Sequence, residues 1–161
     1  MRVGIGYDIH RLKRGLPLKL GGVRVPYTHG LSGHSDGDAL LHAVTDALLG
    51  AAGLGDIGEH FSDRDAKFKN ADSRIFLKAV TGMLARKKWE ILNVDSVIIA
   101  EKPKLSVFKK RVRETLAEIL GVSVSRVNIK AKTHEGLGPV GRGRAIACYA
   151  VAAIGPVKGK K

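Results

Sequence analysis

Two separate stretches of the chain carry the side chains with the clearest capacity for chemistry. Near the N-terminus, the stretch GYDIHRL places Asp8 and His10 two residues apart. A later stretch, DGDALLHAVTDALLGAA, spaces Asp38, His42 and Asp46 four residues apart, which predicts that they share one stripe of a helix. Apolar side chains fill most of this helix, and burying acids and an imidazole is costly unless they are paired or bind a metal. The stripe therefore needs a partner elsewhere in the chain.

Asp8 and His10 are the partners that we expect. Because side chains alternate along a strand, both residues point to the same side of the first strand. Together with His42 they offer one carboxylate and two imidazoles, a set of three ligands that leaves a zinc ion a fourth, open position. Asp46 is expected to accept the second imidazole proton of His42, and Asp38 is expected to support the ligands in a similar manner. The spacing thus favours a metal site between a strand and a helix.

The same residues have simpler structural interpretations. A single histidine such as His42 is more often a satisfied core residue than a metal ligand, and Asp38 can form a helix-capping box with Ser35. The loop GHSDGD also places His34 and Ser35 at the expected N-terminus of the helix, where free backbone N–H groups favour an anion such as phosphate. On spacing alone, these alternatives stay open.

A third group of candidate residues surrounds the glycine-rich loop in IKAKTHEGLGPVGRGRA. Glycines let the backbone approach a ligand closely, Arg142 can pair with a phosphate through two N–H groups, and Glu135 can bind a hard divalent cation. Thr133 lies at the end of the preceding strand. Surface turns often have the same composition, so this group alone does not identify a site.

Apolar periodicity and turn residues predict the secondary structure. The expected strands cover residues 2–11, 16–27, 93–103, 126–135 and 144–154, and the expected helices cover residues 36–52, 71–89 and 107–121. Residues 28–35 are expected to form a polar loop, and residues 53–70 a long connection of the kind that is usually functional or mobile. This order predicts an α+β fold in which helices pack on one face of a single-layer mixed β-sheet.

The first strand has two unlike faces. Val3, Ile5, Tyr7 and Ile9 form one face and are expected to belong to the core, whereas the other face is bare glycine until its end. Because the expected helices pack on one face of the sheet, the opposite face has to be covered by something else. Because the last strand is rich in alanine and glycine, we expect a close symmetric contact between copies of the chain.

Length and composition limit the class of protein. With 161 residues, the chain is expected to be a single domain, residues 1–161, with a basic tail at 157–161. Hydrophobic residues make up 44% without a long uncharged run, which fits neither a membrane span nor a disordered chain. The first residues resemble neither a secretory signal nor a transit peptide, so we expect a cytoplasmic protein. The one cysteine, Cys148, excludes an intrachain disulfide.

The formal net charge of +13 is the main argument for a nucleic-acid-binding protein. Aromatic residues make up 5% of the chain and do not alternate with the basic residues, so the stacking surface of a single-strand binder is missing. Basic charge also attracts smaller anions such as a nucleotide or a diphosphate. We therefore expect a small anionic partner rather than a nucleic acid.

Together, the motifs resemble those of one enzyme family. The stretches GYDIHRL, HGLSGHSDGDALLHAVTDALLGAAGLGDIGEHFSD, ADSR and KAKTHEGLGPVGRGRAIAC are similar to those of the 2-C-methyl-D-erythritol 2,4-cyclodiphosphate synthases, and they extend over nearly the whole chain. The resemblance implies a ferredoxin-like or chorismate-mutase-like fold and a homotrimer with active sites between neighbouring subunits. It also implies one zinc ion per subunit and a magnesium or manganese ion on the nucleotide diphosphate.

The resemblance assigns roles to individual residues. The zinc ligands would be Asp8, His10 and His42, and the ligand of the second cation would be Glu135. The pair that positions the phosphates would be His34 and Thr133. Further contacts with the substrate are expected from Ser35, Asp56, Ile57, Gly58, Phe61, Ser62, Asp63, Arg64 and Asp65. The set on the cytidine side and in the glycine-rich loop comprises Ala100, Glu101, Lys102, Pro103, Lys104, Leu105, Ser106, Lys132, His134, Pro139 and Arg142.

Three positions depart from the family's pattern. Pro139 stands where an aromatic residue is common, Lys132 where a small hydroxyl residue is common, and Arg144 where an acid is common. Pro139 and Arg144 adjoin the centre of the family's trimer, where some members bind isoprenoid diphosphates. These two departures therefore bear on whether the centre of a trimer could bind an isoprenoid diphosphate. They do not affect the expected metal ligands.

The implied substrate is 4-diphosphocytidyl-2-C-methyl-D-erythritol 2-phosphate, whose 2-phosphate attacks the β-phosphorus and releases CMP. The family thus acts as a phosphorus–oxygen lyase on the non-mevalonate path to isoprenoid precursors. Since a phosphate monoester with a second pKa of ~6 is already ionised near neutral pH, neither a serine nucleophile nor a general base is needed. A metal-dependent phosphohydrolase that uses water as the nucleophile is the alternative, and it would give a linear product.

Overall fold

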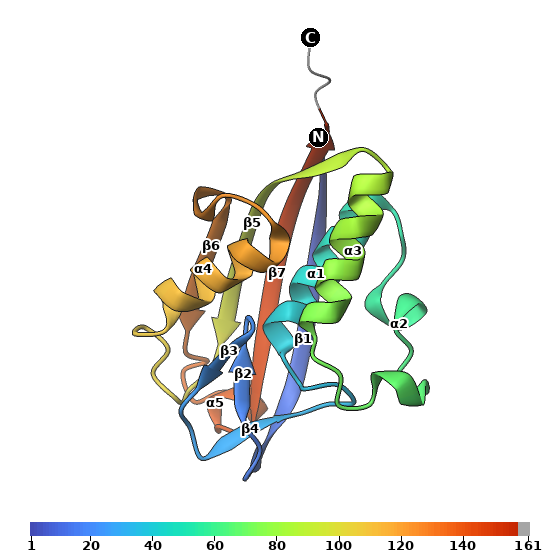
Figure 1. Ribbon diagram of the computed structural model, residues 1–161. Coiled ribbons are helices and arrows are strands. Elements are labelled where there is room, and N and C mark those ends of the chain that lie inside the picture. The colour runs from blue at the N-terminus through green and yellow to red at the C-terminus, as the bar shows by residue number, and fades with distance from the viewer. Residues whose placement is uncertain (158–161) are drawn as a thin grey trace.

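The strands form one five-stranded mixed sheet and a separate two-stranded hairpin (Figure 1). The computed structural model describes residues 1–157; most of the expected basic tail lies outside the described residues. The sheet has the order β4-β1-β7-β5-β6, and only β5 and β6 run parallel within it. Its strands are β1 (Arg2–Arg14), β4 (His29–Ser32), β5 (Trp89–Ile99), β6 (Val127–Lys132) and β7 (Ala145–Pro156).

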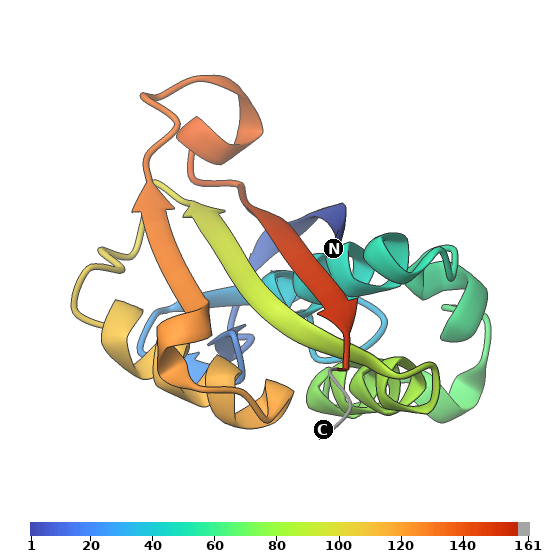
Figure 2. The ribbon, with the colours of Figure 1, turned by 90° about the horizontal axis from the view of Figure 1, so that it is seen from above.

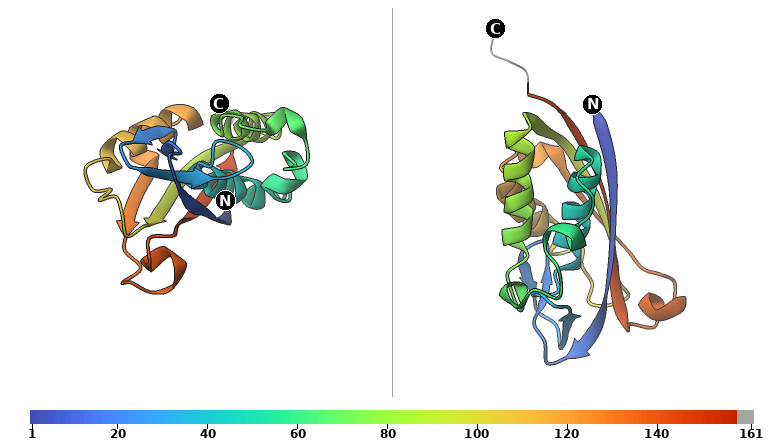
Figure 3. Two further views of the ribbon diagram at one scale, coloured as in Figure 1. Left: turned by 90° about the horizontal axis from the view of Figure 1, so that it is seen from below. Right: turned by 90° about the vertical axis from the view of Figure 1, so that its right-hand side faces the viewer.

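Three helices cover one face of this sheet, as the sequence predicts (Figure 3). They are α1 (Ala39–Ala52), α3 (Arg74–Arg86) and α4 (Lys109–Leu120). Shorter turns of helix are α2 (Ile57–His60), α5 (Gly138–Gly141) and the 3₁₀ turns Ala66–Phe68 and Val124–Arg126. The loop that carries α5 projects from the end of the sheet, away from the helical layer (Figure 2). Among the described residues, no helix is long and apolar enough to cross a membrane.

The boundaries of the elements differ from the sequence prediction in two places near the N-terminus. Helix α1 begins at Ala39 and not at Asp36, because the Asp38 carboxylate caps it by accepting a hydrogen bond from the Leu41 N–H at 3.1 Å. That N–H is therefore not free to bind an anion. Residues His29–Ser32, expected to be loop, form β4 because they pair with the extended end of β1.

The two-stranded hairpin consists of β2 (Leu18–Leu20) and β3 (Val23–Val25). Gly21 and Gly22 connect these strands with φ values of 61° and 77°, the left-handed conformation that a tight two-residue hairpin turn requires. Their N–H groups donate to the two carboxylate oxygens of Asp38 at 2.9 and 2.7 Å. Asp38 thus joins the hairpin to the start of α1. No hydrogen bond links it to a histidine in the described residues, so its expected role beside the metal ligands is replaced by a structural one.

The two faces of β1 are the reverse of the sequence prediction. Val3, Ile5, Tyr7 and Ile9 are 58%, 69%, 46% and 40% exposed, so they do not belong to the core of the chain. The glycine face is the one that packs against α1. A Cβ at Gly6 would overlap the carbonyl oxygen of Ala43 and lie 2.7 Å from the backbone nitrogen of Ala47. The absence of side chains here is what allows the helix to lie directly on the strand.

We predict that Gly6→Ala destabilises the protein by about 2–3 kcal/mol, because the added methyl group forces α1 away from β1. Gly50→Ala is the matched control: a Cβ there has only the Ile5 carbonyl oxygen nearby, at 3.9 Å, and alanine favours a helix by up to about 1 kcal/mol. Denaturant unfolding of both variants measures the difference. Equal stability of Gly6→Ala and the unchanged protein would contradict the packing described above.

Candidate active site

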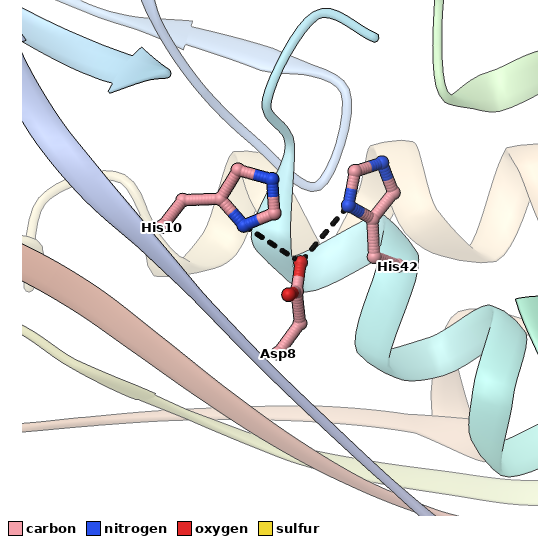
Figure 4. Close-up of side chains that lie close together, drawn as sticks. All are labelled: Asp8, His10 and His42. Atoms are coloured by element: carbon pink, nitrogen blue, oxygen red, sulfur yellow. Dashed lines mark hydrogen bonds and ion pairs between the residues drawn. The ribbon is translucent and has the colours of Figure 1, made fainter. Parts of the chain in front are cut away.

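Asp8, His10 and His42 meet, as the sequence predicts, where the middle of β1 passes the first turns of α1 (Figure 4). The Asp8 Oδ2 atom lies 3.0 Å from Nδ1 of His10 and 2.9 Å from Nδ1 of His42. The two imidazole rings are 5.2 Å apart between their centroids. One atom from each of the three side chains lies within 4.8 Å of the others. This separation allows all three to contact one ion.

The chemistry of the three side chains fits a metal ion. Their exposed fractions are 22% for Asp8, 15% for His10 and 12% for His42, so the group is largely buried but can be reached from solvent. The Nδ1 atom of His10 lies 3.0 Å from Asp8 Oδ2, but the angles at this contact do not fit a hydrogen bond. This buried nitrogen therefore has no hydrogen-bond partner among the described residues. A buried nitrogen of this kind is costly, and coordination to a metal would satisfy it.

Two of these side chains, Asp8 and His10, have shifted pKa values. Burial opposes the ionisation of Asp8, but the adjacent imidazoles of His10 and His42 outweigh it and lower the pKa of Asp8 to about 2. Burial likewise disfavours the charged form of His10, but the Asp8 carboxylate outweighs it and raises the pKa of His10 above its usual value. Without a metal, the group is therefore held together by charge attraction.

A pocket of about 400 Å³ opens on these three side chains. Seven further residues that the sequence assigned to the site line it: His34, Ser35, Asp46, Ile57, Gly58, Phe61 and Asp63. Three lining residues were not predicted: Tyr7, Phe68 and Phe76. Phe61, Phe68 and Phe76 contact one another with ring centroids 4.8–5.6 Å apart, so they form an apolar wall. Their spacing in the sequence gives no periodic signal for this cluster.

Asp46 does not accept a hydrogen bond from His42, contrary to the sequence prediction. Its Oδ1 atom accepts the N–H of Ile57 at 2.7 Å, which ties the start of α2 to α1. Burial raises the pKa of Asp46 above its usual value. The Nε2 atom of His42 instead faces two hydroxyl groups, Ser73 Oγ at 2.8 Å and Ser35 Oγ at 3.0 Å. Ser73 belongs to the ADSR motif, but the sequence assigned it no role.

The connection after α1 is more ordered than the sequence predicts. Asp56 caps α2 through a hydrogen bond from the Glu59 N–H at 3.0 Å, and the carbonyl of Asp65 contacts Nε2 of His34 at 3.2 Å. Ser62 Oγ accepts the N–H of Arg64 at 3.2 Å. Four predicted contact residues of this segment lie beside the pocket without lining it: Asp56, Ser62, Arg64 and Asp65.

A second pocket, of about 410 Å³, lies where β5 and β6 end. It is lined by Ala100, Glu101, Pro103, Lys104, Leu105, Ser106, Ala131, Lys132 and Thr133, all but Ala131 predicted. At its rim, Thr133 Oγ1 donates to Glu135 Oε1 at 2.6 Å, and Glu101 Oε1 accepts the N–H of His134 at 2.7 Å. The predicted cytidine-side residues thus do gather in one place.

The structure does not bring Thr133 and Glu135 to the histidines. Two strands, β7 and β5, separate β1 from β6, which corresponds to roughly 14 Å at the usual strand spacing. Lys102 does not line either pocket, and Arg142 ends the exposed helix α5. Pro139 lines a third cavity, with Arg144, that is separate from both. A single chain therefore holds the predicted site in two halves.

We predict that Asp8 stabilises the metal-free protein above pH 4 and loses this effect as the pH falls. Because its pKa is lower in the folded than in the unfolded chain, folding stability declines as protons bind between about pH 4 and pH 2, by roughly 2 kcal/mol. Unfolding of Asp8→Asn and of the unchanged protein at several pH values measures this. The stability difference between them should shrink toward pH 2; a constant difference contradicts the shift.

Comparison with known proteins places these observations in one family. The YgbB family model matches residues 1–155. The 2-C-methyl-D-erythritol 2,4-cyclodiphosphate synthase of Pseudomonas aeruginosa (strain UCBPP-PA14) is 54% identical over 96% of this chain and 98% of its own length. Among solved structures, the bifunctional IspDF of Campylobacter jejuni has a TM-score of 0.92 at 42% identity, over 95% of this chain and 42% of that longer chain.

A second similar solved structure is a nucleotide complex. It is the IspF of Plasmodium falciparum in complex with CDP, with a TM-score of 0.86 at 36% identity over 98% of this chain and 97% of its own. The match in sequence, fold and length is therefore continuous from end to end. The chain belongs to the YgbB family, whose curated relatives are 2-C-methyl-D-erythritol 2,4-cyclodiphosphate synthases.

Proposed function

We propose that the protein converts 4-diphosphocytidyl-2-C-methyl-D-erythritol 2-phosphate to 2-C-methyl-D-erythritol 2,4-cyclodiphosphate and CMP, in the cytoplasm. The observation that carries this proposal is the group of Asp8, His10 and His42 at the base of a pocket, in a chain of the YgbB family. The CDP complex of a structural relative supports a cytidine nucleotide as the ligand. The reaction closes a ring within one molecule, so the protein has to fold the substrate and relieve its charge.

Two metal ions would take part. Asp8, His10 and His42 would hold a zinc ion, and Glu135 would hold a magnesium or manganese ion on the diphosphate. When bound, these ions supply Lewis-acid stabilisation of the negative charge that develops on the phosphates. The three-residue group fits such an ion because it offers two imidazoles, one carboxylate and an unsatisfied buried nitrogen.

The chain's own residues bind and orient the two ends of the substrate. His34 and Ser35 lie in the first pocket and would hold its phosphates, with Thr133 as their counterpart in the second pocket. The wall of Phe61, Phe68 and Phe76 excludes water from one side of the first pocket. Holding the nucleophile beside the phosphorus in this way contributes up to roughly 7–11 kcal/mol in favourable cases.

A homotrimer would join the two halves of the site. Val3, Ile5, Tyr7 and Ile9 form an exposed apolar face on β1, and Tyr149 and Val151 extend it on β7. Apolar faces of this extent mark a contact with another protein surface. In a cyclic trimer, each interface pairs different surfaces of two copies. The first pocket of one copy, which contains Asp8, His10 and His42, would thus meet the second pocket of its neighbour, at the ends of β5 and β6.

The reaction itself is tested with the diphosphocytidyl substrate, zinc and magnesium, followed by phosphorus NMR. We expect CMP and a cyclic diphosphate as products. A linear product would identify a phosphohydrolase that uses water as the nucleophile. Metal-loaded protein that releases no CMP would refute both activities; in that case, salt-sensitive RNA binding that survives His42→Ala would favour a nucleic-acid-binding protein.

We predict that two inactive variants restore activity when they are mixed within one oligomer. His42→Ala damages the first pocket and Glu135→Ala the second, so an interface between one copy of each can still combine two intact halves. With random mixing after co-expression at equal levels, about one interface in four is intact, which gives about a quarter of the wild-type activity. Each variant alone serves as the control. No recovery in oligomers shown to be mixed would place the whole site within one chain.

A further inference from the structure

A chain of partly buried hydrogen bonds leads away from the proposed metal site on the side opposite to Asp8. It runs from Nε2 of His42 to Ser73 Oγ at 2.8 Å, and from Ser73 Oγ to Asp36 Oδ1 at 2.5 Å. The second carboxylate oxygen of Asp36 accepts from Lys19 Nζ at 2.9 Å. Ser73 is fully buried, so it contacts neither solvent nor a ligand in the pocket.

The direction of these hydrogen bonds is set by Asp36. Besides Lys19, its carboxylate faces the N–H groups of Ser73 at 3.3 Å and of Asp38 at 3.4 Å, and all of these groups are donors. An ionised carboxylate can only accept hydrogen bonds. The single proton of the Ser73 hydroxyl must therefore point to Asp36. Its oxygen is left as an acceptor for His42 and for the Ser35 hydroxyl, 3.2 Å away.

The Ser73 side chain does not cap helix α3, although Ser73 is the N-cap residue of that helix. It stands at the N-cap of α3, where a serine side chain ordinarily accepts a hydrogen bond from the first turn of the helix. Its hydroxyl makes no such bond, and the Arg74 N–H is satisfied by Asp72 Oδ1 at 2.9 Å instead. The Ser73 hydroxyl thus bonds to His42 and Asp36 and not to the backbone N–H groups in the first turn of α3.

We propose that Ser73, oriented by Asp36, keeps a proton on Nε2 of His42 and so leaves Nδ1 as the nitrogen that binds the metal ion. The inference rests on the proposed metal-dependent function. If Nε2 had no proton, its lone pair would face the lone pairs of the Ser73 oxygen at 2.8 Å, which is repulsive. Nδ1 points the other way, toward Asp8. Ser73 and Asp36 are therefore positioning residues for a metal ligand, the role that sequence spacing assigned to Asp46.

The test uses zinc-loaded full-length protein labelled with ¹⁵N-histidine. Long-range proton–nitrogen spectra distinguish coordination through Nδ1, with a proton on Nε2, from coordination through Nε2. We expect the first pattern in the wild type and its loss or mixture in Ser73→Ala. Competition with a chromogenic chelator measures zinc affinity, which should fall about 10- to 100-fold in this variant.

Ser35→Ala is the matched control, because Ser35 Oγ lies 3.0 Å from the same nitrogen and 3.2 Å from Ser73 Oγ but has no contact with Asp36. We expect it to keep the wild-type NMR pattern and zinc affinity within a few-fold. Asp36→Asn serves as a second variant in case Ser73→Ala does not fold. Lys19 and Ser73 donate to different oxygens of the carboxylate, and the amide replaces one of these oxygens by an NH2 donor, so zinc affinity should again fall.

The outcomes separate this inference from the proposed function. If the wild type binds zinc and forms the cyclic product while folded Ser73→Ala keeps the NMR pattern and the affinity, the positioning role is wrong and the function stands. Equal effects of Ser35→Ala and Ser73→Ala also refute the role of Asp36. If the wild type neither binds zinc nor forms product, the proposed function fails first.

Discussion

The direct packing of helix α1 on the glycine face of strand β1 is the constraint on which the rest of the structure depends. A side chain at Gly4 would collide with the backbone at Ala47 and Ala51, and one at Gly6 with the backbone at Ala43 and Ala47. Moving two residues forward along β1, from Gly4 to Gly6, thus shifts the contact by about one turn toward the start of α1. The two distances match, because two strand residues and one helical turn each span roughly 6 Å. The next step brings Asp8 opposite the first turns of α1, where His42 lies. Asp8 and His42, two of the candidate metal ligands, meet because Gly4 and Gly6 let the two backbones run together.

This packing decides what the opposite face of the sheet must do. Because α1 occupies the glycine face, the large apolar side chains of β1 are left on the side without helices, where Tyr7 stacks near Tyr149 with ring centroids 4.6 Å apart. Free exposure of such a surface is unfavourable. The same surface separates the two pockets of one chain, so covering it with further copies would bury the apolar side chains and complete the site together. Stability and activity would then depend on one assembly step.

The parts of the site that rest on local periodicity could be predicted from the sequence. The period of two in a strand and the turn of a helix favoured a meeting of Asp8, His10 and His42, and the resemblance to the family supported it where spacing alone left alternatives open. The alternation on β1 also defines two faces, but it does not say which is buried, and the usual preference for apolar cores gives the wrong answer when another copy covers the apolar side. The partner of His42 could not be predicted either, since Ser73 reaches it only through the docking of α3, 31 residues later. Helical spacing pointed to Asp46, which the fold uses to hold Ile57.

The distribution of charge explains why the two halves of the site need each other. In the described part of the chain, the pocket at the histidines is lined by the acids Asp8, Asp46 and Asp63 and by no lysine or arginine. A phosphorylated substrate would be repelled there unless cations were bound. The second pocket has the opposite character, because Lys104 and Lys132 line it. In the proposed reaction, the first half would depend on metal ions for its positive charge and the second on lysines, so that a substrate with phosphates at both ends would be neutralised only where the two meet.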